Sequence, residues 1–240
     1  IGYTLRRLAS KLCLSSFQAR IATYFSPLQL GVCQPAGLEA SVHSFRHTLQ
    51  CSQFSNSSNP LTALLVDFSN AFNSCDRDTY YGEVVTHFPE LAHYTRWCYQ
   101  KPGFLAYNGQ TLESSSGVQQ GDPLGPFLFS LTLHRFIQRL NHTHCMQYQS
   151  WYLDDGLVIV EPSILPSILQ QFRAFGTDSG LQLHRVKTSL YWPHSAQPIP
   201  VVLSNTGIQV NTEDDGITFL GVPFGSVTSI NNTISTRIAT

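Results

Sequence analysis

The segment that decides the fold is Gln147-Tyr-Gln-Ser-Trp-Tyr-Leu-Asp-Asp-Gly-Leu-Val-Ile-Val160. Residues 147–153 and 157–160 are strand-like runs rich in aromatic and aliphatic side chains. Between them stands Asp154-Asp155-Gly156, and an Asp-Gly dipeptide favours a tight hairpin turn. We therefore predict a β-hairpin with both aspartates at its tip.

A third carboxylate, Asp67, stands at the end of an earlier apolar run. Residues 61–68 read Leu-Thr-Ala-Leu-Leu-Val-Asp-Phe, a pattern that predicts a buried strand. If this strand lies beside the hairpin in one sheet, three carboxylates converge at one edge. They stay ionised together only with cations between them, and Mg²⁺ prefers a few carboxylates completed by water and phosphate. Each element alone also has a simpler interpretation. Asp154-Asp155-Gly156 is a favourable turn sequence, and Asp67 can be a solvated residue at the end of a strand.

A glycine-rich segment precedes the longest apolar helical pattern. Gly117-Val-Gln-Gln-Gly-Asp-Pro-Leu-Gly-Pro126 contains three glycines and two prolines, and residues 123–140 are a predicted helix with proline in its first turn. Such a loop lets a nucleotide approach the backbone, and a helix N-terminus favours anions. An ordinary helix-entry loop is the alternative. Two adjacent glutamines in a tight loop argue against it, because their amides need hydrogen-bond partners.

The other segments alternate helical and strand patterns. Helices are predicted at residues 4–25, ended by Pro27, at 39–49, at 79–100 with a break at Pro89, and at 163–175. A turn followed by a strand is predicted at 180–190, and strands are predicted at 201–203 and 208–210. Hairpins are predicted at 102–112 around Asn108-Gly109 and at 217–222, turning back near Pro223 and Gly225. Residues 51–60 have the composition of a loop and mark the first boundary.

Composition limits the classes of protein that remain. The 240 residues have a net charge of -1, 42% hydrophobic and 12% charged side chains, which excludes a disordered chain and offers no global electrostatic argument for nucleic-acid binding. No apolar run reaches the roughly 18 to 20 residues that cross a bilayer, so no membrane partner is expected. Six cysteines without a Cys-x-x-Cys pair fit neither a disulfide framework nor a zinc ribbon. Without a signal peptide, and with Ile1 first, the chain is expected to be an intracellular fragment.

Five segments, in order, resemble motifs A to E of reverse transcriptases. They are Asp67-Phe-Ser-Asn-Ala-Phe72, the glycine-rich segment 117–126, Tyr152-Leu-Asp-Asp155, Gly180-Leu-Gln-Leu-His-Arg-Val-Lys187 and Phe219-Leu-Gly-Val-Pro-Phe-Gly225. The likeness is greatest to the non-LTR (LINE-like) retroelement group, whose members have counterparts of Gln29-Leu-Gly-Val32 and of residues 37–43. It covers nearly the whole chain.

The resemblance implies an α+β fold, the right-hand polymerase palm, in which an antiparallel sheet is backed by helices. Residues 1–60 would be a partial fingers region, 61–225 the palm with motifs A to E, and 226–240 the start of the thumb or a truncated tail. A retroelement protein is expected in the nucleus or the cytoplasm.

The resemblance also implies an activity, RNA-directed DNA polymerisation. A dNTP would be added to a primer 3′-hydroxyl on an RNA or DNA template, with two Mg²⁺ ions as cofactors and Mn²⁺ as a substitute. Asp67, Asp154 and Asp155 correspond to the metal ligands. Lys187 corresponds to a motif D lysine that can donate a proton to the departing pyrophosphate.

Further residues correspond to substrate contacts. Phe72 matches the steric gate that excludes a 2′-hydroxyl, Gln120 and Gly121 match the loop lining the nucleotide and template, and Phe219, Leu220 and Gly221 match the primer grip. Tyr152, directly before the acidic pair, is a candidate for stacking on a base.

Two other functions stay open. An RNA-dependent RNA polymerase palm shares the carboxylates, although Phe72 disfavours it, and a decayed retroelement could leave a non-catalytic nucleic-acid-binding remnant, although three intact carboxylates weigh against that. The chain departs from the family at His184, where Asn is frequent. Most of the basic fingers and the thumb, expected elsewhere in the polyprotein, are missing, so we expect this chain alone to be weakly active or inactive.

Overall fold

The computed structural model describes residues 4–51, 60–144 and 146–239, which fold around a five-stranded sheet. Its strand order is β4 (Tyr148–Tyr152), β5 (Asp155–Val160), β1 (Thr62–Val66), β6 (Ser189–Trp192) and β7 (Gln209–Thr212). Neighbouring strands are antiparallel except for the parallel pair β6 and β7. Strand β1 therefore lies at the centre, which explains why its sequence is apolar.

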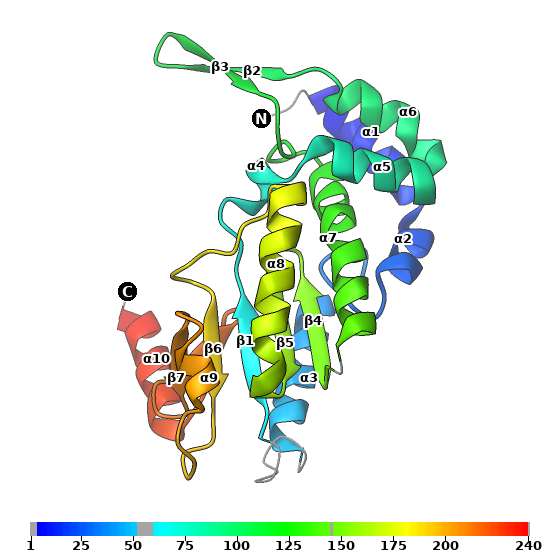
Figure 1. The fold of residues 1–240 in the computed structure, drawn as a ribbon. Helices are drawn as coiled ribbons and strands as arrows, with labels where there is room; N and C mark the ends of the chain where they lie inside the picture. The colour runs from blue at the N-terminus through cyan, green and yellow to red at the C-terminus, as the bar shows by residue number, and fades with distance from the viewer. Residues whose placement is uncertain (1–3, 52–59, 145, 240) are drawn as a thin grey trace.

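Side chains of β1 alternate between two hydrophobic cores. Leu64 and Val66 pack in the core formed with α7 (Leu124–Thr143) and α8 (Leu165–Ser179), the two helices that cross one face of the sheet in Figure 1. Ala63 and Leu65 pack on the other face against α3 (Gly37–Gln50) and the hairpin of β8 (Ile217–Phe219) and β9 (Val222–Phe224). A strand buried on both faces is held rigidly, so the residue that follows it is well positioned.

Four helices gather at one end of the molecule (Figure 1): α1 (Thr4–Ser15), α2 (Gln18–Phe25), α5 (Arg77–His87) and α6 (Pro89–Tyr99). The hairpin of β2 (Gly103–Tyr107) and β3 (Gln110–Ser114) projects from this end. Its turn residues Asn108 and Gly109 have φ values of 49° and 75°, the left-handed conformation that an Asn-Gly hairpin turn requires. The hairpin predicted around these two residues is confirmed.

Short elements complete the chain. Helix α4 (Ala71–Ser74) follows β1, the 3-10 helix η1 (Pro162–Ile164) precedes α8, α9 (Val201–Ser204) precedes β7, and α10 (Val227–Ala239) packs beside β9. None of the described helices combines the length and the apolarity that crossing a bilayer requires.

Several boundaries differ from the sequence-based predictions. The helix predicted at 4–25 is two helices, since the chain turns at residues 16 and 17. Residues 201–203 form α9 rather than a strand, because Pro200 provides a helix N-terminus whose carbonyl accepts from Leu203 N–H at 2.9 Å. The last hairpin turns at Leu220 and Gly221, not near Pro223 and Gly225. Residues 52–59 of the predicted loop lie outside the described part of the chain.

Candidate active site

The structure brings Asp67, Asp154 and Asp155 to one end of the central sheet. Val66, the last residue of β1, pairs with Gly156 of β5, so Asp67 follows one partner and Asp155 precedes the other. Asp154 lies in the turn that joins β4 to β5. The three carboxyl groups, from segments far apart in the sequence, therefore stand on neighbouring strand ends.

The acidic turn is shorter than predicted and is shifted by one residue. Tyr152 pairs with Asp155, so the turn consists of Leu153 and Asp154, and Asp155 begins β5. The prediction that both aspartates lie at the tip is wrong. Leu153 takes the left-handed φ of 56°, which a branched side chain rarely adopts without support from its surroundings. Gly156 lies within the strand, where a Cβ would come within 2.3 Å of the Trp151 ring.

Gln29 provides that support. Its side-chain Oε1 accepts the Leu153 N–H at 2.8 Å, and its Nε2 donates to the Leu153 carbonyl at 3.0 Å. Gln29 is completely buried, and its segment pairs with the end of β4, where Leu30 N–H donates to the Trp151 carbonyl at 2.7 Å. Gly31 also approaches closely, since a Cβ there would meet Leu153 N at 2.5 Å. The segment around Gln29 thus holds the acidic turn in shape, a role that sequence reasoning missed.

The charges around the turn act on one another. Burial, with repulsion from Asp67, raises the pKa of Asp154, and Lys187 partly offsets this. Desolvation, followed by repulsion from Asp154 and then Asp67, raises the pKa of Asp155 to about 6, although its side chain reaches solvent. Both carboxyl groups therefore hold their protons more strongly than usual, which is the effect expected where like charges converge.

Lys187 is the nearest described cation to this cluster, with its Nζ 3.8 Å from Asp67 Oδ2. It lies on the loop between α8 and β6, which is tied to Asp67 through the backbone. The Asp67 carbonyl accepts from His184 N–H at 2.8 Å and from the Thr188 hydroxyl at 3.1 Å. The loop therefore places the lysine beside the carboxylates.

His184 shapes the part of this loop that carries the lysine. Its Nδ1 accepts the N–H groups of Val186 at 3.3 Å and of Lys187 at 3.2 Å. An asparagine side-chain oxygen can accept the same pair of N–H groups in an Asx-type turn. A histidine at position 184, where the family frequently has Asn, therefore preserves the local hydrogen bonding.

Phe72 lies on α4, directly after the Asp67 segment. It is partly buried, and its ring stacks on Phe129 of α7 with centroids 4.6 Å apart and planes at 19°. Its carbonyl accepts the Val118 N–H at 2.7 Å. The ring is thus fixed by α7, and the backbone of the glycine-rich segment is fastened to the same short helix.

Glycine is required at position 117 by the protein's own packing. Gly117 has a φ of 68°, and a Cβ there would come within 2.4 Å of the Asn73 backbone. Gln120 and Gly121 are exposed, Gly121 has a φ of 83°, and nothing lies within 4 Å of a Cβ built there. The loop therefore closes tightly on α4 at its start and leaves its tip open.

Asp122 anchors the far side of this loop, and sequence reasoning assigned it no role. It is only 5% exposed and accepts hydrogen bonds from the Arg6 guanidinium at 2.8 Å, the Tyr99 hydroxyl at 2.9 Å and the Leu124 N–H at 3.0 Å. Tyr99 Oη in turn accepts the Gln119 N–H at 3.3 Å. This network joins α1, α6 and the start of α7.

The residues matched to the primer grip lie on the small hairpin against α3. Phe219 is buried edge-to-face on Phe45, with centroids 5.8 Å apart. Leu220 and Gly221 form the turn with φ values of 48° and 80°, and the Arg237 guanidinium donates to the Gly221 carbonyl. Tyr152, at the end of β4, is partly buried beside the acidic turn.

The carboxylates are suitable ligands for a hard cation, but they do not form a complete set of protein ligands around one. Among the residues that the structure describes, no group of three or more His, Cys, Asp or Glu side chains is arranged to hold a metal ion. Carboxylate oxygens are the donors that Mg²⁺ takes, and in phosphate-handling sites one or two of them suffice beside water and phosphate oxygens. Repulsion among Asp67, Asp154 and Asp155 is the feature that a cation relieves. The residues present therefore fit such an ion.

Solved structures with a similar fold include three structures of telomerase from two Candida species. They are telomerase from Candida albicans in complex with a TWJ fragment of telomeric RNA (13% identity, TM-score 0.57, 94% of this chain and 36% of that chain), apo telomerase from Candida tropicalis (11%, 0.60, 92% and 39%) and a C-terminally truncated apo form from Candida tropicalis (13%, 0.58, 95% and 45%). This chain spans less than half the length of those chains. At such identity the likeness shows the fold, an α+β arrangement similar to the palm and fingers of telomerase reverse transcriptase.

Comparison at the sequence level gives a family. No curated protein matches the chain. Residues 7–224, by contrast, match the family model described as "Reverse transcriptase (RNA-dependent DNA polymerase)". That match covers most of the chain and agrees with its fold, so the chain belongs to the reverse transcriptase family.

Proposed function

We propose that this chain is the palm and part of the fingers of an RNA-directed DNA polymerase from a non-LTR (LINE-like) retroelement. The single observation that carries the proposal is the convergence of Asp67, Asp154 and Asp155 at neighbouring ends of β1 and β5, with Lys187 Nζ 3.8 Å from Asp67 Oδ2. Three carboxyl groups that repel one another beside a lysine suit phosphoryl transfer, in which both cations and a proton donor are needed.

The carboxylates and the lysine have different roles in the proposed reaction. Two Mg²⁺ ions, or Mn²⁺, held by Asp67 and Asp154 with Asp155 beside them, would activate the primer 3′-hydroxyl and stabilise the leaving pyrophosphate. Lys187 holds the proton that the pyrophosphate oxygen takes up, and its ion pair with Asp67 keeps the ammonium near the reacting groups.

The nucleotide would lie between Phe72 and the glycine-rich loop. Because Phe72 is braced by Phe129, its ring cannot retreat easily, and a ribose 2′-hydroxyl would collide with it. The open tip at Gln120 and Gly121 offers an amide and bare backbone to the nucleotide and template, and Tyr152 offers a ring to a base.

The remaining parts hold the primer and template. We propose residues 1–60 as a partial fingers region, 61–225 as the palm with motifs A to E, and 226–240 as the start of the thumb or a truncated tail. Phe219, Leu220 and Gly221 would form the primer grip on the β8–β9 turn. The partners are a primer strand on an RNA or DNA template, and dNTP.

The test is addition of one nucleotide to a DNA primer on RNA and DNA templates, with Mg²⁺ or with EDTA, by a longer chain that carries this segment together with complete fingers and a thumb. We expect product only with the metal, and Asp154→Asn should reduce it by more than the roughly 10- to 100-fold that changes beside a metal site produce. Mn²⁺ binding, measured by electron paramagnetic resonance, should weaken in the same variant. Equal product or equal Mn²⁺ affinity in Asp154→Asn contradicts the proposal.

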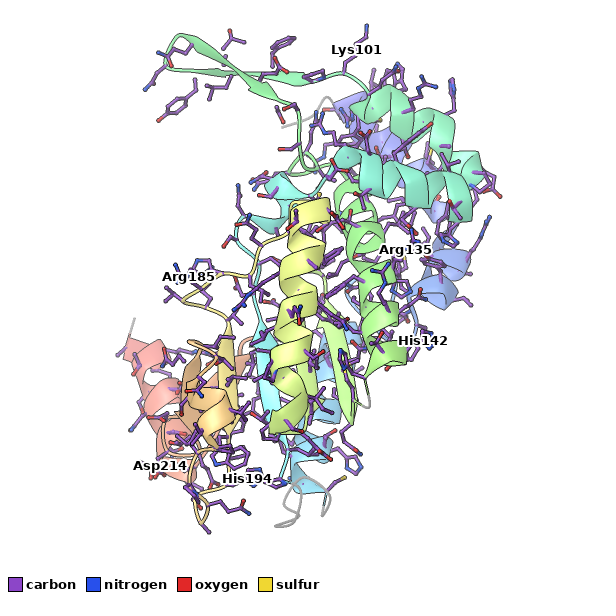
Figure 2. The ribbon with its side chains drawn as sticks, viewed as in Figure 1. Lys101, Arg135, His142, Arg185, His194 and Asp214 are labelled. Carbon is purple, nitrogen blue, oxygen red and sulfur yellow. The ribbon has the colours of Figure 1, made fainter. Side chains whose placement is uncertain are left out.

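A matched control is Asp214→Asn. Asp214 is exposed and lies on the turn between β7 and β8. Figure 2 shows it well away from α4, the short helix that follows Asp67. This variant should bind Mn²⁺ and add nucleotide like the parent protein. Phe72→Ala tests the gate in the same assay, and it should gain the use of ribonucleotides while it keeps dNTP addition.

A further inference from the structure

The glycine-rich segment is joined to the helix that carries Phe72 by hydrogen bonds between their backbones. The Phe72 carbonyl accepts the Val118 N–H at 2.7 Å. The Cys75 carbonyl, just after the same helix, accepts the Gly117 N–H at 2.8 Å. In Figure 1 the chain returns from β3 to α7 beside α4 and the start of α5. The candidate gate and the candidate nucleotide loop are therefore held as one unit.

Arg77 clamps this unit from the first turn of α5. Its guanidinium donates to three carbonyl oxygens, those of Gly117 at 3.0 Å, Ser116 at 3.1 Å and Tyr99 at 3.4 Å. The guanidinium also lies over the Tyr99 ring, 5.5 Å from its centroid. Two of the three acceptors belong to the entrance of the glycine-rich segment, and the third lies at the end of α6.

The acceptors of Arg77 are uncharged backbone groups. Among the residues that the structure describes, Arg77 takes part in no ion pair, so its hydrogen bonds and not a salt bridge account for its place. A charged donor strengthens a hydrogen bond to a carbonyl, and the planar fork aims several N–H groups at once. The side chain is partly buried, which limits competition from water.

Tyr99 connects Arg77 to the far side of the loop. The Tyr99 hydroxyl accepts the Gln119 N–H at 3.3 Å and donates to the Asp122 carboxylate at 2.9 Å. Because the carbonyl of the same tyrosine accepts from Arg77, the guanidinium is bonded directly to one end of the loop and through Tyr99 to the other.

The gap between the Phe72 ring and the loop tip is thus fixed from two sides. Phe129 supports the ring from α7. Gln120 and Gly121 at the tip are exposed, so their position depends on the two ends of the loop, which Arg77 holds. A change at Arg77 therefore alters the space between gate and loop without touching either.

We propose that Arg77 is a positioning residue for sugar selection. It holds the loop at the distance from Phe72 at which a deoxyribose fits and a ribose 2′-hydroxyl does not. Without the guanidinium, three carbonyls lose their donor and the loop relaxes away from the gate, which gives the ribose room. The inference rests on the proposed function, because it takes Phe72 as the gate.

Single-nucleotide addition by the longer chain, with dNTP and rNTP compared over a range of concentrations, tests the proposal. Arg77→Met keeps a long side chain and removes its donors. We expect the KM for dNTP to rise and the preference for dNTP over rNTP to fall, each by about tenfold or more, while kcat with dNTP changes less. Arg77→Lys should behave like Arg77→Met, because one ammonium group does not reproduce the fork.

Two control variants separate this role from a general loss of stability. Arg96→Met changes an exposed arginine of α6 and should match the parent protein. Thr62→Val removes a buried hydroxyl that donates to the Tyr191 carbonyl at 3.1 Å, at the opposite end of β1 from Asp67. It should lower stability in urea and leave the KM and the sugar preference unchanged.

Amide hydrogen exchange of this chain, in EDTA and without nucleotide, gives a readout that does not depend on activity. The N–H groups of Gly117 and Val118 should exchange about tenfold or more faster in Arg77→Met, because the clamp that opposes local opening is lost. Arg96→Met should leave their exchange at the parent rate. Parent-like exchange of both groups in Arg77→Met contradicts the clamp.

Phe72→Ala, measured in the same nucleotide assay, distinguishes the two ways in which the proposal can fail. If Phe72→Ala lowers the sugar preference and Arg77→Met does not, the inference about Arg77 is wrong and the gate stands. If neither variant lowers the preference, the gate and this inference both fail. An equal effect of Thr62→Val and Arg77→Met on the preference also overturns the inference, since stability alone would then explain it.

Discussion

The side-chain amide of Gln29 makes two hydrogen bonds to the backbone of Leu153, accepting its N–H at 2.8 Å and donating to its carbonyl at 3.0 Å. Leu153 is the left-handed residue of the turn that presents Asp154. A buried glutamine thus fixes the conformation of a turn whose own sequence does not favour it.

Gln29→Leu should leave the N–H and the carbonyl of Leu153 without partners. We expect a loss of about 2 to 3 kcal/mol in the free energy of unfolding, measured in urea, because each stranded backbone group costs about 1 to 3 kcal/mol. Mn²⁺ affinity should fall as well, since Asp154 loses its fixed position. Gln100→Leu, an exposed position at the end of α6, is the control, and an equal loss there would contradict the assignment.

His184 gives a prediction with a built-in rescue. His184→Leu removes the acceptor of the Val186 and Lys187 N–H groups, so the rate of single-nucleotide addition should fall by about tenfold or more, as for other supporting residues around a site. His184→Asn retains an acceptor and should stay close to the parent rate. If the Leu and Asn variants lose activity equally, the hydrogen bonds of His184 do not position the lysine.

Asp155 should make the metal-free protein less stable as pH rises. Its folded pKa of about 6 exceeds the value of about 3.9 for an unfolded aspartate. The folded state therefore holds the proton longer, and the unfolding free energy falls between about pH 4 and 6. With allowance for solvent screening, Asp155→Asn should be more stable than the parent by on the order of 1 kcal/mol at pH 7.5 in EDTA, and equal to it at pH 4.

Mn²⁺ binding gives the companion measurement. Protons compete with the cation for Asp155, so the affinity of the parent protein should drop as pH falls below about 6. Mn²⁺ affinity that stays constant from pH 7.5 to 5 would show that Asp155 does not contribute to the cation site.

Two ion pairs of similar length should differ sharply in their effect on stability. Arg6 lies 2.8 Å from Asp122, whose side chain is 3% exposed, and Arg20 lies 2.7 Å from Glu90, whose side chain is 50% exposed. Asp122→Ala should reduce the unfolding free energy by about 3 to 5 kcal/mol, because it strands a half-buried guanidinium and removes the acceptor of the Leu124 N–H at the start of α7. Glu90→Ala should cost at most about 1 kcal/mol. Urea unfolding of both variants gives the comparison.

Local patterns predict the elements of this fold well where one physical cause dominates. The apolar run before Asp67 is a central strand, and Asn108-Gly109 is the turn of a hairpin. The acidic turn was misplaced by one residue because local preference favours Asp-Gly, whereas contacts with Gln29 impose the turn at Leu153. The sequence predicts a strand at residues 201–203, where the structure has a helix, because a short apolar run does not distinguish a strand from one turn of helix.

The residues of the candidate site also fall into two groups, those that local sequence patterns predict and those that they do not. Its carboxylates could be found because each lies at or beside the end of a strand, and their proximity follows from the pairing of β1 with β5. The partners of Gln29 and Asp122 could not be found, because those residues act across 124 and 116 positions of the chain. No periodicity or local spacing encodes contacts over such separations.

The hydrogen bonds of Gln29 to Leu153, across 124 positions of the chain, also bear on which shortened forms of this chain would keep the acidic turn in shape. A copy that begins after Gly31 retains all three aspartates and the lysine, and a census of acidic residues would count it as intact. It has nonetheless lost the only described side chain that hydrogen-bonds the backbone of Leu153, so its turn is free to relax toward the Asp-Gly geometry that the local sequence prefers. Survival of the Gln29 segment together with the aspartates is therefore a better mark of an intact acidic turn than survival of the aspartates alone.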